Sequence, residues 1–212
     1  MKMQAACILC NDTNVVILFK DTREYLHCQN CDLVFVPAYQ RLKPSEELKR
    51  YNFHENNPDD KRYKGFLNKL FEPVNERIKP NSHGLDFGSG PCPVLSFMFE
   101  EKGHEMQIYD HYYANESAVF GTQYDFITAT EVLEHLFYPN KELDRVWSCL
   151  KPNGILGIMT KFSPDLKKFA YWYYKNDDTH VAFYSKKTFE FLKVKWNASL
   201  EFIGDNVVIF YK

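Results

Sequence analysis

The sequence lacks an excess of either charge and lacks any long apolar run. Its 212 residues include 26 Lys and Arg against 28 Asp and Glu, a formal net charge of -2. Polyanion binding depends on accumulated cationic side chains, so this balance argues against a surface built as a whole for nucleic acid. No segment approaches the roughly 18 consecutive apolar residues of a membrane-spanning helix, and Met1–Cys7 lacks the apolar region of a secretory signal. We therefore expect no membrane partner and a cytoplasmic location.

Cysteine is sparse but unevenly placed. Four of the six cysteines form the pairs Cys7-x-x-Cys10 and Cys28-x-x-Cys31, with 17 residues between the pairs. Two such pairs can surround a tetrahedral ion, and the apolar residues between them indicate strands that return the chain to the site. The sequence predicts a small zinc ribbon over residues 1–40, with a structural Zn²⁺ bound by all four thiolates. The alternative is four unrelated buried cysteines.

The predicted ribbon is slightly acidic. Residues 1–40 carry three basic and four acidic side chains, a surface that would not attract phosphates. A role in folding or in positioning substrate is expected in preference to contact with nucleic acid.

Residues 41–80 are expected to form a linker and helices. Pro37 to Pro44 indicates a linker, and Ser45-Glu46-Glu47 places acids in the first turn of a short helix. From Lys61 onward, apolar residues recur at three- and four-residue steps and predict a second helix, which Pro73 should bend or interrupt.

From residue 81 the chain alternates between strand and helix patterns. Such alternation predicts an α/β domain over residues 81–212, a Rossmann-like mostly parallel sheet with helices on both faces. The end differs from a simple dinucleotide fold, because two apolar segments flank the turn residues Gly204-Asp205-Asn206 and predict an antiparallel hairpin. The expected strands are 85–87, 106–109, 124–129, 155–159, 199–203 and 207–211, and the expected helices are 94–101 and 140–150.

A glycine-containing loop follows the first of these strands. In a nicotinamide fingerprint starting at Gly88 and Gly90, the third glycine would fall on Pro93, which weakens that interpretation. The pattern acid-x-Gly-x-Gly-x-Gly fits better, with Asp86 ahead of the two glycines and the small Cys92 in the last place. An acid that binds ribose hydroxyls is expected about 20 residues on, at the end of the next strand, where Asp110 stands.

From Gly84 to the C-terminus the chain resembles a class I S-adenosylmethionine-dependent methyltransferase. Tyr124–Leu136 and Leu150–Leu156 resemble the ubiquinone-methyltransferase-like branch. The resemblance implies S-adenosylmethionine as cofactor, with Asp110 at its ribose. Only 13 residues separate Asp110 from Tyr124, where the family usually has another strand and helix; Tyr112 and Tyr113 are candidates for the adenine wall, with core packing as the alternative. The cofactor-binding residues are expected to be Asp86, Phe87, Gly88, Ser89, Gly90, Pro91, Asp110, Thr130 and Glu131.

Two acids and two histidines form a candidate second metal site. A helix that begins near Thr130 would place Glu131, Glu134 and His135 on one face, and His180 follows the fifth strand. Carboxylates and imidazoles of this kind could hold Mg²⁺, Mn²⁺ or another divalent ion. A similar pattern occurs in the metal-dependent small-RNA 2′-O-methyltransferases.

Two alternatives to the metal remain open. Glu134, His135 and His180 are expected to be catalytic, and His180 could act as a general base or substrate contact without an ion. In the other, the acids cap a helix and the histidine is structural.

The leading functional expectation is methylation of a small-molecule acceptor at oxygen or carbon. Trp172, Tyr173 and Phe183 are candidates to line a pocket for a flat acceptor, with core packing as the alternative. Residues 160–196 carry eight lysines against four acids and would tolerate an anionic substrate. RNA is a less favoured partner, and a zinc-ribbon adaptor without turnover is a third possibility.

Overall fold

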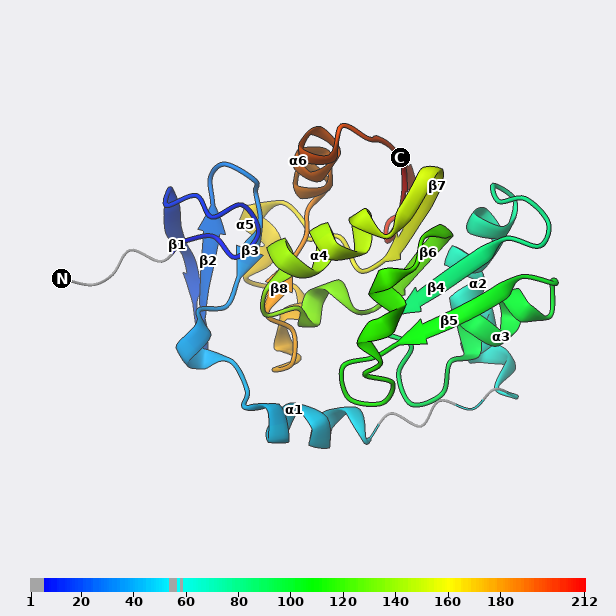
Figure 1. Cartoon of the computed structure of the whole chain (residues 1–212). Helices are drawn as coiled ribbons and strands as arrows, with labels where there is room; N and C mark the ends of the chain where they lie inside the picture. Colours follow the sequence, from blue (N-terminus) through cyan, green and yellow to red (C-terminus); the bar gives the residue numbers. More distant parts are fainter. Residues whose placement is uncertain (1–5, 54–56, 58) are drawn as a thin grey trace.

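The computed structural model of the chain describes residues 6–53, 57 and 59–212. Residues 1–5 of the predicted ribbon thus lie outside the described part of the chain. The described residues form a sheet of six strands and a sheet of four, with helices around them (Figure 1). The first three strands of the chain belong to the small sheet, and the last two belong to the large sheet.

The large sheet has the strand order β5-β4-β6-β7-β10-β9. Strand β4 pairs in parallel with β5 and β6, and β6 pairs in parallel with β7. Strand β10 is antiparallel to both β7 and β9, so β9 runs in the direction of β7. The predicted mostly parallel sheet with a final antiparallel hairpin is confirmed. Its strands are β4 (His83–Phe87), β5 (Glu105–Tyr109), β6 (Tyr124–Thr130), β7 (Leu150–Met159), β9 (Ser199–Ile203) and β10 (Val207–Tyr211).

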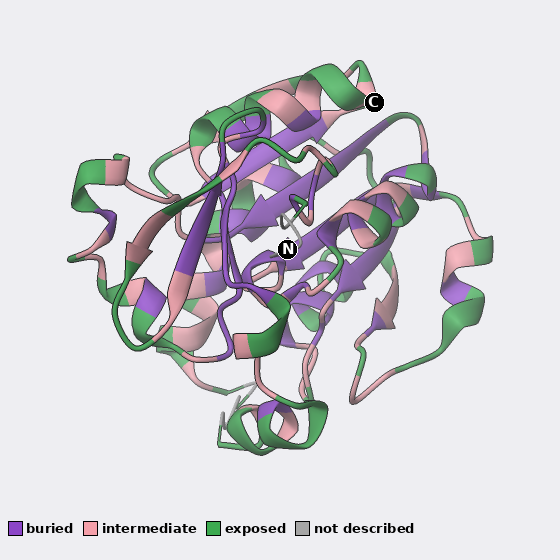
Figure 2. Cartoon of the chain, turned by 90° about the vertical axis from the view of Figure 1, so that its left-hand side faces the viewer, coloured by how far each residue is buried: buried purple, intermediate pink, exposed green. Residues whose placement is uncertain are grey.

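Helices cover both faces of this sheet, as expected. Successive side chains of a strand point to opposite faces. In β10, Val207 and Ile209 join the core that contains α2 and α3, whereas Val208 and Phe210 join the core that contains α4 and α6. Burial on both faces explains the continuous apolar run of this strand. Buried residues concentrate in the strands, and exposed residues lie on the outer faces of the helices (Figure 2). The helices are α1 (Pro44–Tyr51), α2 (Lys61–Asn75), α3 (Val94–Glu100), α4 (Pro139–Ser148), α5 (Leu166–Phe169) and α6 (Lys186–Trp196), with the 3₁₀ turns η1 (Ala38–Gln40), η2 (Ser117–Gly121), η3 (Leu133–His135) and η4 (Tyr173–Asn176).

Helix α2 lies against the sheet without a break at Pro73. Asp60 caps its first turn by accepting a hydrogen bond of 2.8 Å from the Arg62 amide. The expected interruption at Pro73 is absent: the helix ends two residues later, at Asn75. A proline this close to the C-terminus removes one backbone donor but leaves few turns for its ring to disturb. Gly157 of β7 allows the close approach, since a Cβ there would lie 2.6 Å from Val74 Cγ2.

The small sheet contains one strand from far along the chain. It has the order β1-β2-β3-β8, with strands β1 (Val15–Lys20), β2 (Glu24–Cys28), β3 (Val34–Phe35) and β8 (Ala182–Phe183). Val34 pairs with Phe183 and Phe35 with Ala182 in antiparallel register. The cysteine-bearing segment and the segment after β7 therefore share one sheet, an arrangement that the predicted division at residue 40 does not contain.

On the far side of β5, the large sheet has no further strand among the described residues. Between Asp110 and Tyr124, all of which the structure describes, the chain makes only a bridge from Asp110 to Ala114 and the 3₁₀ turn η2. Strand β5 is thus the edge strand, in line with the short spacing in the sequence.

No helix of the described residues combines the length and the apolar character that are needed to cross a bilayer.

Candidate functional site

The loop between β4 and α3 depends on its two glycines. Gly88 and Gly90 have φ angles of 82° and 67°, in the left-handed region where a side chain is strained. A Cβ on Gly88 would also lie 2.1 Å from Val132 Cγ2. The amides of Gly88 and Ser89 both donate to the carbonyl of Tyr109, at 2.7 and 3.2 Å. The loop is thereby fixed over the end of β5.

Asp110 links this loop to the end of the neighbouring strand. Its Oδ2 accepts from the Gly90 amide at 3.0 Å, and its Oδ1 accepts from the amides of Tyr112 and Tyr113 at 2.8 and 3.1 Å. The carboxylate lies at the carboxyl edge of the sheet, where ligands of open α/β sheets bind.

Asp86 lies beneath the loop rather than facing a ligand. It is 3% exposed and accepts from Thr128 Oγ1 at 2.9 Å and from Ser96 Oγ at 3.4 Å. Burial raises the pKa of this carboxyl to about 6. Among the residues predicted to bind cofactor it is the one that does not line the cavity described next. Its contacts support the loop from the core side.

A cavity of about 1260 Å³ lies over this edge of the sheet. Phe87, the loop Gly88–Pro91 and Asp110 line one side, and Thr130, Glu131, His135 and His180 line another. The hydroxyl Oγ1 of Thr130 has no hydrogen-bond partner among the described residues. An unpaired buried hydroxyl in a cavity is a group that a ligand can satisfy.

Helix α1 closes part of the cavity through polar contacts. Glu47 of α1 is 6% exposed, and its two oxygens accept from the hydroxyls of Tyr51 at 2.9 Å and Tyr112 at 2.5 Å. The hydroxyl of Tyr113 donates to Asn52 Oδ1 at 2.7 Å. The two tyrosines proposed for an adenine wall thus line the cavity and also fasten α1 to the segment after β5.

Three of the four predicted metal ligands lie together. One ligand atom from each of Glu134, His135 and His180 lies within 4.8 Å of the others. The expected helix from Thr130 is wrong: β6 runs to Thr130, Glu131 has a φ of 51°, and only the 3₁₀ turn η3 follows. Glu131 is not in the group of three.

Both histidines have one ring nitrogen bound to a backbone carbonyl. His135 Nδ1 donates to the Thr179 carbonyl at 3.2 Å, and His180 Nδ1 donates to the Tyr174 carbonyl at 2.8 Å. A carbonyl only accepts, so the proton lies on Nδ1 and the Nε2 of a neutral ring carries the lone pair. Burial lowers the pKa of His180, which favours the neutral ring. Histidines that ligate metals show this arrangement.

Tyr174 connects the two acids. Its hydroxyl donates to Glu131 Oε2 at 3.0 Å and also contacts Glu134 Oε1, while Thr160 Oγ1 donates to Glu134 Oε2 at 3.0 Å. Burial and the neighbouring Glu134 raise the pKa of Glu131 to about 8. Two carboxylates this close favour a shared proton or a cation.

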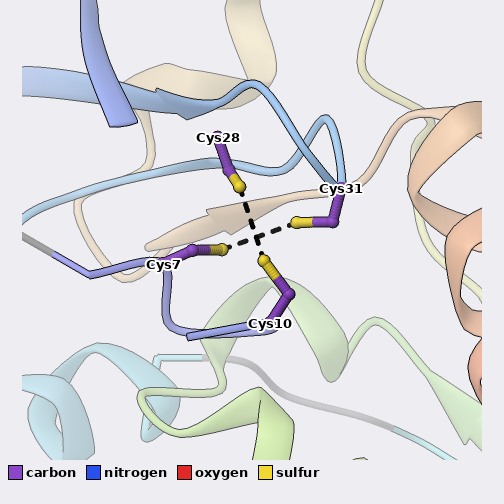
Figure 3. A group of neighbouring side chains, drawn as sticks. All are labelled: Cys7, Cys10, Cys28 and Cys31. Carbon is purple, nitrogen blue, oxygen red and sulfur yellow. Dashed lines mark hydrogen bonds between the residues drawn. The ribbon is translucent and has the colours of Figure 1, made fainter. Parts of the chain in front are cut away.

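The four paired cysteines form a second cluster, which does not line the cavity and is supported by the small sheet. Cys7 Sγ lies 3.5 Å from Cys31 Sγ, and Cys10 Sγ lies 3.5 Å from Cys28 Sγ (Figure 3). Tetrahedral zinc with Zn–S bonds of about 2.3 Å holds sulfurs about 3.8 Å apart, so the donor set and its spacing fit this ion.

The two cysteine turns have the same backbone geometry. In the first, the Asn11 amide donates to the Cys7 carbonyl at 2.9 Å, and in the second the Asp32 amide donates to the Cys28 carbonyl at 2.9 Å. Both closing residues, Asn11 and Asp32, have a φ of 61°. Two equivalent turns that face each other present four thiols to one point.

The aromatic residues near His180 do not line the cavity as the sequence suggested. Phe183 is buried in the core behind the small sheet, Trp172 packs against that core, and Tyr173 is 67% exposed. Tyr174, in the same run, is the one that reaches the acids. Nothing in its spacing separated Tyr174 from its neighbours, because the run has no regular helix to give it a face. The sequence likewise placed acids in the first turn of α1 but did not indicate that they contribute to the site.

Comparison with known proteins identifies the family of the chain. A family model described as a methyltransferase domain matches residues 53–192. No curated protein matches the chain. Among solved structures, human N-acetylserotonin methyltransferase in complex with S-adenosylmethionine has a TM-score of 0.59 and 13% identity, covering 78% of this chain and 56% of its own.

Two structures from Burkholderia thailandensis are also similar. The 1,6-didemethyltoxoflavin-N1-methyltransferase, with bound 1,6-didemethyltoxoflavin and S-adenosylhomocysteine, has a TM-score of 0.53 and 13% identity, covering 87% of this chain and 96% of its own. An O-methyltransferase family protein has a TM-score of 0.52 and 11% identity, covering 70% of this chain and 55% of its own. The chain thus spans little more than half the length of that protein and of the human enzyme. The match over residues 53–192, on a sheet with this strand order, shows that the chain belongs to a family of class I S-adenosylmethionine-dependent methyltransferases.

Proposed function

We propose that this protein transfers the methyl group of S-adenosylmethionine to an oxygen or carbon atom of a small-molecule acceptor. The observation that carries the proposal is that one continuous cavity of about 1260 Å³ is lined both by the glycine loop and by His135 and His180. Ligand cavities are commonly about 300–1000 Å³, so this one has room for a cofactor and a second molecule. Two structurally similar enzymes are named for small molecules, N-acetylserotonin and 1,6-didemethyltoxoflavin, which supports this substrate class.

The residues at the carboxyl edge of the sheet are suited to the cofactor. The backbone of Gly88–Pro91 permits close approach, Asp110 offers a carboxylate at the end of β5, and Thr130 offers an unpaired hydroxyl. Phe87 and Glu131 contribute further lining, and Asp86 holds the loop from below. When bound, S-adenosylmethionine supplies an electrophilic methyl group, so the protein has to align the acceptor, exclude water and remove a proton.

We further propose that Glu134, His135 and His180 hold a divalent cation, with Glu131 as the fourth candidate ligand. Ligand atoms within 4.8 Å of one another and two imidazoles held through Nδ1 support the proposal. Such a cation would bind the acceptor oxygen and stabilise its deprotonated form. Without the cation, the neutral His180 is the candidate general base.

Three finer assignments rest on other parts of the chain. Zinc at Cys7, Cys10, Cys28 and Cys31 is proposed from their spacing, and a reducing, cytoplasmic location is proposed because none of the six cysteines forms a disulfide. The ubiquinone-methyltransferase-like branch is proposed from Tyr124–Leu136 together with Leu150–Leu156.

Titration calorimetry with S-adenosylhomocysteine tests the cofactor site. Binding is expected for the wild type, with affinity reduced at least tenfold in Asp110→Ala and unchanged in Asp205→Ala, an exposed carboxylate in the β9–β10 turn. Transfer of a labelled methyl group, screened over acceptor fractions with and without added Mn²⁺ or Mg²⁺, then tests turnover and identifies the acceptor. No binding by the wild type, or equal binding by Asp110→Ala, would overturn the proposal.

RNA is the second candidate acceptor, because the Glu134–His135–His180 group resembles the site of the small-RNA 2′-O-methyltransferases. Filter binding of short RNAs over a salt series decides between the two. For a phosphate-binding surface, the logarithm of the association constant falls linearly with the logarithm of the salt concentration, whereas a small-molecule enzyme binds no RNA at any salt concentration tested.

A further inference from the structure

Arg23 lies in the turn between β1 and β2, in the cysteine-bearing part of the chain, yet its side chain contacts a segment more than 150 residues away. Its Nη1 donates to the carbonyls of Asp178 and His180 at 3.0 and 3.1 Å. Its Nη2 donates to the carbonyls of Lys175 and Asp177 at 2.5 and 2.9 Å. One guanidinium thus binds four carbonyls within a run of six residues.

That run has little regular structure of its own. It begins in the last two residues of η4 and ends just before the two-residue strand β8. Local support comes from Asp177 Oδ1, which accepts from the Thr179 amide at 2.9 Å, and from the His180 amide, which donates to the Asp177 carbonyl at 3.2 Å. Segments of this kind have the lowest local stability in a fold, so external contacts decide their position.

The neighbours of Arg23 contact the same run. Lys175 Nζ, 5% exposed as a residue, pairs with Asp21 Oδ2 at 2.5 Å, and the Tyr25 hydroxyl donates to the Lys175 carbonyl at 3.2 Å. The Arg23 guanidinium lies 5.5 Å from the centre of the Tyr25 ring. Three residues of one hairpin therefore hold one end of the run, and the pairing of β3 with β8 holds the other.

The run carries His180 of the candidate metal site. Arg23 bonds the His180 carbonyl, and the imidazole in turn bonds the Tyr174 carbonyl, just before Lys175. The next residue, Val181, donates its amide to the Glu134 carbonyl at 2.7 Å, and Thr179 accepts from the His135 ring. The backbone that Arg23 holds is thus in contact with all three members of the Glu134–His135–His180 group.

We propose that Arg23 is a positioning residue for His180, and that through it the cysteine-bearing hairpin sets the geometry of the Glu134–His135–His180 site. This inference rests on the proposed function only for the metal readout below. Arginine suits the task because its planar fork carries five donors, whereas lysine has a single ammonium centre that reaches fewer carbonyls at once.

Hydrogen exchange on the full-length, zinc-loaded protein tests the proposal without reference to activity. In Arg23→Ala the amides of residues 177–181 should exchange at least tenfold faster than in the wild type, with a smaller increase in Arg23→Lys. Arg77→Ala is the matched control, since Arg77 also makes several hydrogen bonds, to Glu201, Tyr211 and the Pro73 carbonyl, but none of these partners belongs to residues 175–181. It should leave these amides unchanged.

The second readout is the affinity for Mn²⁺ alone, measured by electron paramagnetic resonance. Loss of groups that orient metal ligands commonly weakens binding 10- to 100-fold, and we expect a loss of this size in Arg23→Ala, a smaller one in Arg23→Lys and none in Arg77→Ala. Binding of S-adenosylhomocysteine should be equal in all four proteins, which separates a positioning role from general loss of structure.

The outcomes are distinguishable. If the wild type binds no Mn²⁺, the proposed second metal is wrong, and exchange of residues 177–181 still decides the role of Arg23. Unchanged exchange in Arg23→Ala would overturn the inference. So would unchanged Mn²⁺ affinity in a wild type that binds the ion. Should Arg23→Ala fail to fold, Arg23→Lys carries both comparisons.

Discussion

Asp86 is a buried carboxyl whose charge disfavours the folded state. Its pKa is raised from 3.8 to about 6, chiefly by burial. The folded protein therefore holds this proton more tightly than the unfolded chain does. The protonated carboxyl therefore contributes to the free energy of unfolding. This contribution is complete below pH 3.8 and is lost as the pH rises through about 6.

We predict that Asp86→Asn removes this pH dependence. An amide can keep the bond from Thr128 Oγ1 and donate to Ser96 Oγ, without a charge to bury. At pH 7 to 8 the variant should be more stable than the wild type by at most about 3 kcal/mol, the value of a two-unit shift, and the two should converge near pH 4. Denaturant unfolding over this pH range measures the difference. Parallel stability curves for the two proteins would contradict the prediction.

Gly88 is the residue where backbone and packing both exclude a side chain. The φ of Gly88 is 82°, and a Cβ at this position would lie 2.1 Å from Val132 Cγ2. Gly88→Ala should therefore cost about 1–3 kcal/mol of stability and weaken S-adenosylhomocysteine binding at least tenfold. Thermal unfolding and calorimetry measure the two effects, and the double variant Gly88→Ala/Val132→Ala should recover part of each.

Gly65 provides the opposite control for that substitution. It lies inside α2, and a Cβ there meets nothing within 4 Å. Gly65→Ala should stabilise the protein by about 0.5–1 kcal/mol through helix propensity alone, with cofactor affinity unchanged. Equal behaviour of the two alanine variants would show that the Gly88 loop is not constrained as described.

At the scale of elements, α1 stands out because little apolar surface holds it. Its one buried residue is Glu47, which is fixed by Tyr51 and Tyr112. We predict that Glu47→Ala loosens this helix over the cavity: its amides should exchange faster and S-adenosylhomocysteine should bind several-fold more weakly. The melting temperature should change little, since Glu47 belongs to none of the three apolar cores. Lys49→Ala, an exposed position of the same helix, should match the wild type, and a large loss of melting temperature in Glu47→Ala would contradict this account.

Elements with their own local signal were predictable, and those defined by distant partners were not. Strands β4, β6 and β10 are largely buried and rich in apolar residues, and the sequence located each to within two residues. Strand β8 has only two residues, Ala182 and Phe183, and it is a strand because Val34 and Phe35 lie beside it. The helix expected at Thr130 failed because spacing cannot reveal that Glu131 adopts a left-handed φ of 51°.

The candidate site likewise contains residues that were predictable from the sequence and residues that were not. The glycine loop and Asp110 follow from fixed spacings along one βαβ unit, so the sequence placed them. The carboxylate contacts of Tyr174 and the carbonyl contacts of Arg23 depend on how the small sheet packs against the segment after β7. No pattern within either segment contains that information.

At the scale of the whole molecule, the two sheets meet through β8, and this connection sets the expected effect of zinc removal. Structural zinc in small cysteine sites contributes about 10–16 kcal/mol, so a chelator or Cys28→Ser should release β1, β2 and β3 and, through β8 and Arg23, the segment that carries His180. The core between the large sheet and helices α2 and α3 contains none of the four cysteines, whereas the core on the other face includes Cys7, Cys28 and Cys31 and should loosen. The large sheet should stay folded, since its strands pair with one another and the first of these cores is left intact.

We therefore predict that zinc removal separates two properties of the enzyme. Elemental analysis should find one zinc per chain, absent in Cys28→Ser and retained in Cys92→Ser, whose half-buried thiol lies outside the cluster. S-adenosylhomocysteine should bind within about threefold of the wild type, a free-energy change below 1 kcal/mol. Hydrogen exchange at residues 177–181 should rise and methyl transfer should fall. Joint loss of cofactor binding and transfer would instead show that the cysteine cluster supports the whole fold, because the glycine loop and Asp110 would then depend on it as much as His180 does.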